Sequence, residues 1–311
     1  MGRAVEESLT AREPVLIVGT GALAIFFAAR LSANGVPVSM LGTWKQGLSA
    51  LKSRGARLAL EDGRELSAPV QAGDDPAAYR GARLALVLVK AWQTERAAAR
   101  LQQCLSPDGL AVSLQNGLGN RETLAARLGE ERVALGVTTY GATLLGPGLA
   151  RPGGEGLISL QLSTSKIAAG LEALLNGAGF RVDRVPDARV LLWGKLVASS
   201  AINPLTALLR VPNGVLLARP GARAMMAELA QETAAVARAL GVKLPFPDVV
   251  AAVEQVARQT AANRSSMLQD VERGAQTEID AICGAVARSG ETLGVPVPLN
   301  RLMQRLVGAL A

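Results

Sequence analysis

The chain opens on a strand, a glycine turn and a helix, and this order constrains the fold more than any other feature. Residues 14–18 (PVLIV) form a short apolar run bounded by glycine, which is typical of a buried strand. Residues 19–24 (GTGALA) follow, and an alanine-rich helix is expected to run to about Asn34, where Gly35 stops it. A second strand is expected at residues 36–41. Strand, helix and strand in this order form the βαβ unit that begins a parallel sheet.

Further apolar runs continue this alternation. Residues 84–89 (LALVLV) are continuously apolar, which is typical of a parallel strand buried on both faces. We expect other strands at residues 110–114, 133–137 and 157–162, and helices at residues 93–105 and 121–128. The alternation predicts an α/β fold with a doubly wound sheet of the Rossmann type.

The character of the sequence changes after about Pro186. Strand-like runs stop, and segments rich in Ala, Leu, Glu and Arg predict helices at residues 190–209, 222–240, 247–262, 277–293 and 299–310. We therefore expect three parts. They are a loose tail at residues 1–13, an N-terminal Rossmann-type domain at residues 14–186, and an all-α C-terminal domain at residues 187–311.

The first glycine turn matches the GxGxxG/A pattern of dinucleotide-binding loops. Gly19 allows the tight turn, Gly21 lets backbone amides approach a pyrophosphate, and Ala24 lets helix and strand pack closely. Cofactor binding is therefore expected at Gly19, Thr20, Gly21, Ala22, Leu23 and Ala24. A glycine turn with a purely structural role is the alternative.

The end of the second strand bears on the choice of cofactor. NAD-specific sites place a carboxylate there to hold the ribose hydroxyls. Residues 40–45 (MLGTWK) contain no acid, and Thr43 and Lys45 are candidates to bind a 2′-phosphate. The sequence therefore favours NADP(H), with a solvated surface lysine at position 45 as the alternative.

Composition excludes several kinds of site. The 311 residues contain no histidine, so acid–base chemistry falls to Lys, Glu, Asp or Tyr. Cys104 and Cys283 are far apart, so neither a metal site nor a disulfide scaffold is expected. The formal net charge is +7, but the basic residues are scattered singly, which disfavours a nucleic-acid partner. An arginine-rich surface or a positive site for anionic ligands accounts for the charge.

No membrane partner is expected. Residues 1–13 are polar and lack the apolar region of a secretory signal. Residues 190–209 are apolar but include Lys195, Ser199, Ser200, Asn203 and Pro204, which suits a buried core helix better than a membrane span. A cytoplasmic location is the default expectation.

Two polar residues follow expected strands. Lys90 ends the run at residues 84–89, and Asn116 follows the strand at residues 110–114. Ligands of doubly wound sheets bind beyond the carboxyl ends of the strands, so both are site candidates. A strand emerging into water and an ordinary Asn-Gly turn are the alternatives.

Lys195 is the only charged residue between Val190 and Leu209. Burying a lone ammonium is costly unless it is paired or its pKa falls, so such a lysine is a candidate proton donor or anion ligand. Reduction of a ketone needs a proton for the nascent alkoxide, and no histidine can supply it. A lysine that snorkels to the surface is the alternative.

Two candidate capping boxes lie in the C-terminal part. Ser266 with Gln269, and Thr277 with Asp280, have the required spacing, and the second would begin the helix expected at residues 277–293. Gly274 offers a break between the two segments. Capping is therefore the ordinary explanation for Ser266.

Taken together, these residues resemble the ketopantoate reductase (2-dehydropantoate 2-reductase) family over nearly the whole chain after residue 14. The most specific pieces are Lys90–Gln93, Gln115–Gly117, Leu192–Leu196, Ile202–Thr206, Pro212–Gly214, Ser265–Asp270 and Thr277–Asp280. The resemblance implies an NADP-binding Rossmann domain at residues 14–186, followed by a helical domain at residues 187–311 that carries the substrate and catalytic groups. It also implies NADPH-dependent reduction of 2-dehydropantoate to (R)-pantoate, a step towards pantothenate and coenzyme A.

The resemblance also implies residue roles. Lys195 matches the general acid, and Glu278 matches the glutamate that holds the substrate hydroxyl and orients that lysine. Substrate-binding positions are matched by Asn203, Asn213 and Ser266. Lys90 and Asn116 match residues that contact both cofactor and substrate.

The sequence departs from the family pattern at two positions. Ser199 stands where the family has a substrate-contacting asparagine, and Thr43 stands where a basic residue often holds the 2′-phosphate. Ser199 remains a substrate-binding candidate through its shorter hydroxyl. A reductase of another branched 2-keto acid and a non-catalytic dinucleotide-binding protein are the alternatives, and a homodimer is an open option.

Overall fold

The structure is a computed structural model that describes residues 13–162 and 166–310. The tail expected at residues 1–13 lies outside the described residues, apart from Glu13. The described chain forms two compact units. The first unit comprises the chain up to Val89, Gln93–Gln115 and Asn120–Ala188, and the second comprises Lys90–Trp92, Asn116–Gly119 and the chain from Arg189 onward.

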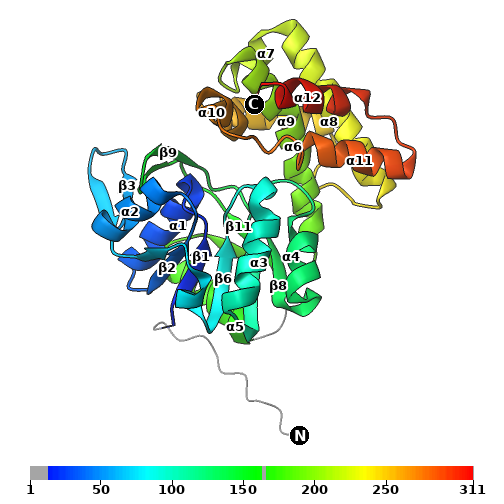
Figure 1. Ribbon diagram of the computed structural model, residues 1–311. Helices are drawn as coiled ribbons and strands as arrows, with labels where there is room; N and C mark the ends of the chain where they lie inside the picture. Colours follow the sequence, from blue (N-terminus) through cyan, green and yellow to red (C-terminus); the bar gives the residue numbers. More distant parts are fainter. Residues whose placement is uncertain (1–12, 163–165, 311) are drawn as a thin grey trace, which may run out of the picture. The chain divides into compact units, whose positions relative to one another are not determined.

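An eight-stranded sheet organises the first unit (Figure 1), in the order β12-β11-β8-β7-β6-β1-β2-β5. Its strands are β1 (Val15–Val18), β2 (Val38–Leu41), β5 (Gln71–Gly73), β6 (Ala82–Val87), β7 (Leu105–Ser113), β8 (Val133–Thr138), β11 (Ile158–Gln161) and β12 (Val182–Arg184). Every pairing is parallel except that of β8 with β11. The sequence prediction of a doubly wound sheet is confirmed.

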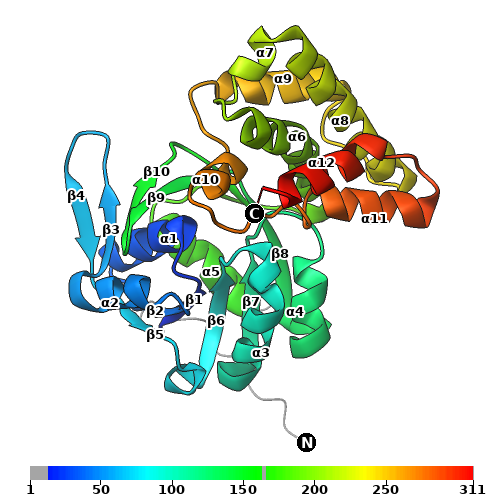
Figure 2. The ribbon, with the colours of Figure 1, turned by 45° about the horizontal axis from the view of Figure 1, so that its top comes forward.

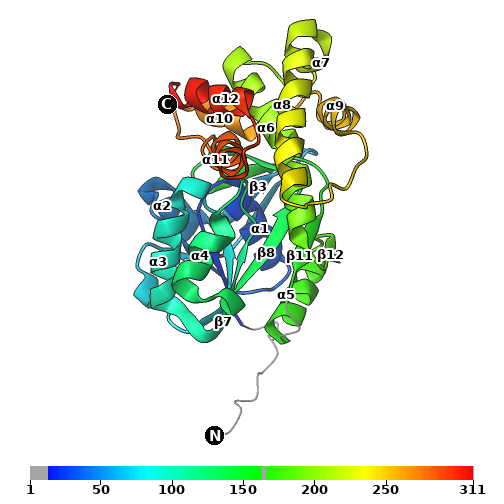
Figure 3. The ribbon, with the colours of Figure 1, turned by 90° about the vertical axis from the view of Figure 1, so that its right-hand side faces the viewer.

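Alternating strand residues bury both faces of this sheet. Val15 and Ile17 of β1 belong to the core that includes α1 (Ala22–Ala33) and α5 (Lys166–Gly177). Leu16 and Val18 belong to the core that includes α3 (Thr94–Cys104) and α4 (Asn120–Leu128). Because successive strand side chains point to opposite faces, a continuously apolar strand requires helices on both sides (Figure 3).

A second, four-stranded sheet was not expected from the sequence. Its order is β4-β3-β10-β9, with β3 (Ala56–Ala59), β4 (Glu65–Ala68), β9 (Ala142–Gly146) and β10 (Leu149–Pro152). The sheet covers α1, as Figure 2 shows. Its short strands carry exposed polar residues and show no long apolar run, so hydrophobic periodicity could not reveal them.

The second unit is helical, as expected. Its helices are α6 (Ala188–Leu209), α7 (Val215–Ala218), α8 (Pro220–Ala239), α9 (Val249–Gln259), α10 (Ser266–Glu272), α11 (Cys283–Leu293) and α12 (Pro298–Gly308). One apolar core joins α6, α8, α9, α11 and α12. None of the helices in the described part of the chain is long and apolar enough to cross a membrane.

One helix boundary differs from the prediction. The helix expected at residues 277–293 begins instead at Cys283, and residues 278–282 before it form a bend and turns. The Thr277 hydroxyl accepts a hydrogen bond from the Ile279 amide rather than from Asp280, so the expected capping box is absent there. Glu278 therefore lies in a turn and not in the first turn of a helix.

Candidate active site

The glycine loop of the first unit has the local geometry that the sequence predicted. Gly19 has φ +132°, and a Cβ at this position would lie 3.1 Å from the carbonyl carbon and oxygen of Leu88. Gly21 begins α1 without a side-chain cap, and a Cβ there would meet nothing within 4 Å. Ala24 is fully buried against the sheet. Open space therefore lies beside the amides of the first turn, whose dipoles favour an anion.

The loop after β2 brings together more basic groups than the sequence analysis named. Thr43 is exposed, and Lys45 is an exposed residue that begins α2 (Lys45–Arg54). Arg96 of α3 donates to the Thr43 hydroxyl, with Nη2 and Oγ1 3.4 Å apart. Arg100, one turn further along α3, donates to the backbone carbonyls of Gly42 and Asp74.

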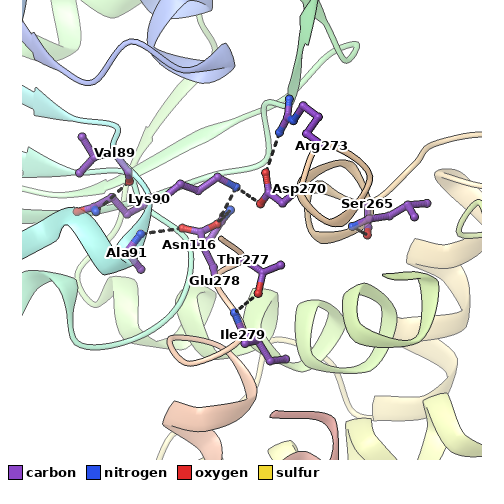
Figure 4. Close-up of polar contacts among 12 residues, drawn as sticks. Val89, Lys90, Ala91, Asn116, Ser265, Asp270, Arg273, Thr277, Glu278 and Ile279 are labelled. Carbon is purple, nitrogen blue, oxygen red and sulfur yellow. Dashed lines mark hydrogen bonds and ion pairs between the residues drawn. The ribbon is translucent and has the colours of Figure 1, made fainter. Parts of the chain in front are cut away.

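The second unit contains a compact cluster built from three distant parts of the sequence (Figure 4). The Lys90 ammonium lies 2.6 Å from Oδ2 of Asp270 and 3.5 Å from Oε2 of Glu278. The Ala91 amide donates to Oε1 of Glu278 at 3.0 Å, and Nδ2 of Asn116 donates to Oε2 at 3.3 Å. The Glu278 carboxylate is therefore held by a cation, a backbone amide and a side-chain amide.

Lys195 joins this cluster through Asn116. The Lys195 Nζ donates to Oδ1 of Asn116 at 2.7 Å, while the amide nitrogen of the same asparagine donates to Glu278. Burial lowers the pKa of Lys195 from its ordinary 10.5 to about 8, and the nearby Glu278 carboxylate opposes part of that fall. A lysine whose pKa lies this close to neutral pH can donate a proton more readily than an ordinary lysine.

Two buried carboxylates fix the charge state of Lys90. The side chains of Asp270 and Glu278 are only 3% and 5% exposed, so each needs a cationic or hydrogen-bonded partner. Burial opposes the charged form of Lys90, but the attraction of Glu278 and Asp270 outweighs it and raises the pKa of Lys90. Arg273 also donates to Asp270, at 2.7 Å.

Close backbone packing brings Asn116 to Glu278. Gly117 has φ +81°, and a Cβ there would lie 2.5 Å from the carbonyl oxygen of Ala281. The amide of Leu118 donates to that same oxygen at 3.0 Å. Only glycine, which tolerates positive φ and has no side chain, allows this approach.

A proline in α6 ties that helix to the same turn. Pro204 has no N–H, so the carbonyl of Ser200, four residues earlier, lacks its helical partner. The thiol of Cys283 donates to this carbonyl, with sulfur and oxygen 3.7 Å apart. Cys283 directly follows the turns that carry Glu278, so this bond links the helix of Lys195 to the Glu278 segment.

The remaining predicted substrate residues lie at other points of the second unit. Ser199 and Asn203 follow Lys195 by one and two turns on the same side of α6, about 6 and 12 Å along the axis. Both are partly buried. Asn213 is buried beyond the end of α6, and its Nδ2 donates to the Thr260 hydroxyl at 2.9 Å.

Ser266 is exposed and begins α10, but it is not the capping residue. The cap is Ser265, whose hydroxyl accepts from the Leu268 amide at 3.0 Å and from the Thr206 hydroxyl at 2.8 Å. The capping box expected at Ser266 is therefore wrong: the cap lies one residue earlier, and Leu268, three residues after it, cannot complete a box. The Ser265 hydroxyl contacts α6, whereas the exposed Ser266 side chain takes no part in the cap.

Asp270, Arg273 and the Ala91 amide belong to the cluster of the second unit, and Arg96 lies beside Thr43 in the first unit. None of these groups was expected from the sequence as a site group. Asp270 stood inside a family-like motif, and its position after the apolar pair Met267-Leu268 was a usable signal, because such a carboxylate is buried with them. Arg96 gave no such signal, since it lies more than 50 residues from Thr43 in the sequence.

Comparison with known proteins agrees with this architecture. Residues 15–164 match the family described as "Ketopantoate reductase PanE/ApbA", and residues 187–311 match its C-terminal part. A 2-dehydropantoate 2-reductase of Archaeoglobus fulgidus is 36% identical over 94% of this chain and 96% of its own length. One from Halobacterium salinarum is 32% identical over 94% and 97%.

Solved structures agree as well. A ketopantoate reductase of this family from Ralstonia eutropha is 35% identical, with a TM-score of 0.88 over 96% of this chain and 98% of that one. A D-mandelate dehydrogenase, solved with NADH and anilino(oxo)acetate, is 27% identical, with a TM-score of 0.89 over the same shares. The fold and these relatives define the protein as a two-domain oxidoreductase with a Rossmann-type sheet. Within that class, the chain belongs to the ketopantoate reductase family.

Proposed function

We propose that this protein reduces 2-dehydropantoate to (R)-pantoate with NADPH, and that Lys195 donates the proton. The hydrogen-bonded series Lys195–Asn116–Glu278 carries the proposal, because it joins a lysine of lowered pKa to a buried carboxylate. The names of the relatives support the substrate. In this proposal residues 14–186 bind the cofactor and residues 187–311 carry the substrate and catalytic groups.

The glycine loop fits a dinucleotide. The space beside Gly21, the uncapped start of α1 and the absence of acidic residues in its first turn all suit a pyrophosphate. Residues 19–24 would hold the phosphates through their amides, and Thr43 and Lys45, which follow β2, would contact the adenosine ribose. A bound nicotinamide dinucleotide supplies the hydride.

Lys195 supplies the proton. With a pKa of about 8 it is largely protonated at neutral pH, and its acidity is closer to that needed for donation than an ordinary lysine's. The Nζ proton passes to the carbonyl oxygen of the substrate as that oxygen becomes an alkoxide, which leaves a neutral amine to be reprotonated from solvent. The bond to Asn116 fixes the direction of Nζ.

Glu278 recognises the hydroxyl of the substrate. Its carboxylate already accepts from the Ala91 amide and from Asn116, and a carboxylate oxygen can accept a further O–H donor. The cluster as a whole holds more cations than anions, since Lys90, Lys195 and Arg273 face Asp270 and Glu278. An excess of positive charge suits a substrate carboxylate.

Further substrate contacts are proposed along α6 and at the start of α10. Ser199 and Asn203 lie on the Lys195 side of α6, and Ser266 begins α10, which the Thr206–Ser265 bond holds against α6. Lys90 and Asn116 are proposed to contact both cofactor and substrate. Substrate contact by Asn213, whose amide already binds Thr260, remains a prediction.

A substrate panel tests the proposal. Rates are followed by NADPH absorbance with 2-dehydropantoate, a branched 2-keto acid that lacks the terminal hydroxyl, and an aromatic 2-keto acid. Because Glu278 is proposed to hold the hydroxyl, we expect kcat/KM for 2-dehydropantoate to exceed that of the hydroxyl-free acid by about 10- to 100-fold. A higher kcat/KM for either competitor rejects the substrate assignment.

An NADH-dependent dehydrogenase of another 2-hydroxy acid is the second candidate. The similarity to the D-mandelate dehydrogenase solved with NADH favours it, as does Ser199 in place of the family asparagine. Under this candidate NADH matches NADPH, and the aromatic acid is the best substrate of the panel. No turnover of any acid, with dinucleotide still bound, would favour a binding protein without chemistry.

A further inference from the structure

The end of β2 carries an arginine that comes from a different helix. Arg96 lies in the first turn of α3, yet its guanidinium reaches the hydroxyl of Thr43, the second residue after β2. The 3.4 Å separation makes this a weak hydrogen bond, so it engages little of a group with five N–H donors. An exposed guanidinium therefore lies beside an exposed hydroxyl in the first unit.

Arg100 lies next to Arg96 on α3, but its guanidinium is already hydrogen-bonded to the backbone. Its guanidinium donates to the carbonyls of Gly42 and Asp74, the residues that directly follow β2 and β5. Burial and then the neighbouring Arg96 lower the pKa of Arg100, and the Asp74 carboxylate opposes this fall. Two guanidinium groups thus lie close enough to repel each other, and Arg100 holds the backbone on which Thr43 stands.

The nearby acidic residue of α3 does not neutralise Arg96. Glu95 is turned to Arg127 of α4, whose Nε donates to it at 2.7 Å. Within the described ranges, no ion pair joins Arg96 to a carboxylate. Like charges held together at an exposed site stabilise a bound anion, because the anion removes their repulsion.

The geometry points to Arg96, with the Thr43 hydroxyl beside it, as the group that recognises the 2′-phosphate of the dinucleotide. This assignment rests on the proposed NADPH dependence. In Rossmann-type sheets the adenosine ribose lies at the end of the second strand, where Thr43 stands. A planar guanidinium binds phosphate through paired N–H donors. Arg96 thereby replaces the basic residue that position 43 lacks.

Binding of two small probes tests the assignment without turnover. Adenosine 2′,5′-bisphosphate carries the 2′-phosphate, and adenosine 5′-phosphate lacks it. Calorimetric titration of the wild-type protein and of Arg96→Ala gives the affinity ratio of the two probes. We expect the wild type to prefer the bisphosphate and Arg96→Ala to lose about 10- to 100-fold of that preference, the usual range for losing a charged hydrogen bond.

Steady-state kinetics provide the second readout. Arg96→Ala is expected to raise KM for NADPH by a similar factor while leaving kcat/KM with NADH within about twofold of wild type. Arg96→Lys keeps the charge without the paired donors and should fall between the two. Arg181→Ala is the matched control, because it removes an exposed arginine of the first unit next to β12, the opposite edge strand of the sheet.

The outcomes separate the two proposals. A wild type that prefers the bisphosphate, with the preference unchanged in Arg96→Ala, overturns the assignment of Arg96 and leaves NADPH dependence standing. A wild type that binds both probes equally overturns NADPH dependence and the assignment together. An equal loss of preference in Arg181→Ala would show a general charge effect and would also overturn the assignment.

Discussion

Glu278→Gln should move the pH dependence of the reaction to lower pH. Lys195 is active as a donor only when protonated, so kcat/KM should be constant below its pKa of about 8 and fall tenfold per pH unit above it. The Glu278 carboxylate stabilises the ammonium and raises this pKa. Removing the carboxylate charge therefore lowers the pKa of Lys195, and the break in the profile moves to lower pH by the same amount.

The structure gives the size of the shift. The bonds of 2.7 and 3.3 Å through Asn116 place the two charges at most about 8 Å apart. At an effective dielectric constant of about 20, charges ~8 Å apart attract by about 2 kcal/mol. That energy corresponds to about 1.5 pKa units, so the break should move from about 8 to about 6.5.

The assay is a pH profile of kcat/KM from about pH 5.5 to 9.5 for the wild type and two variants. Asp280→Asn is the matched control, because it removes an exposed carboxylate from the same turn, where Asp280 contacts Gln304. Its break should stay near 8. A break that stays at 8 in Glu278→Gln, or moves to higher pH, would refute the electrostatic coupling of Glu278 to Lys195.

Two further predictions concern packing. Gly117→Ala should destabilise the protein by about 1–3 kcal/mol in urea unfolding and lower kcat, because its Cβ would collide with the Ala281 carbonyl. Gly119→Ala, also at positive φ but with open space around its Cβ, should leave kcat unchanged; equal effects on kcat would contradict this. Cys104 and Cys283 are buried, which raises both thiol pKa values, to about 11 for Cys104. A thiol reagent at pH 8 should therefore label only the unfolded chain, and rapid labelling of native protein would contradict the packing.

Much of the fold could be predicted because its signals are local. The apolar run at residues 84–89 is hydrophobic on both faces, and the structure places it between two helical layers. The small sheet of β3, β4, β9 and β10 could not be predicted in this way, because it joins two local antiparallel pairs, β3–β4 and β9–β10, through the distant pairing of β3 with β10. Their short segments carry little periodicity of their own.

The site was predictable where one residue broke a local pattern. Lys195 interrupts an apolar helix, and this isolated charge identified it as a candidate site residue. The start of α11 was misplaced because the spacing of Thr277 and Asp280 fits a capping box, whereas contact with the segment around Gly117 holds these residues in turns. Tertiary contacts of this kind decide a helix boundary and cannot be read from spacing.

Contacts between distant segments account for the residues that were missed. Asp270 belongs to the cluster because it pairs with Lys90, which is 180 positions earlier in the chain. Arg96 likewise contacts Thr43, which is distant in the sequence. Asp270 offered a local signal in its apolar neighbours and Arg96 offered none, but only the folded chain shows which residue each one contacts.

Lys195→Ala tests the central claim most directly. Turnover of 2-dehydropantoate and the affinity for NADPH are measured for the wild type, Lys195→Ala and Lys243→Ala, which removes an exposed lysine of the same unit. We predict that Lys195→Ala lowers kcat by about 10²- to 10⁴-fold, the range for losing a general acid, and leaves NADPH affinity within a few-fold. Lys243→Ala should match the wild type. Undiminished turnover by Lys195→Ala would contradict the proposed role of Lys195 as the proton donor.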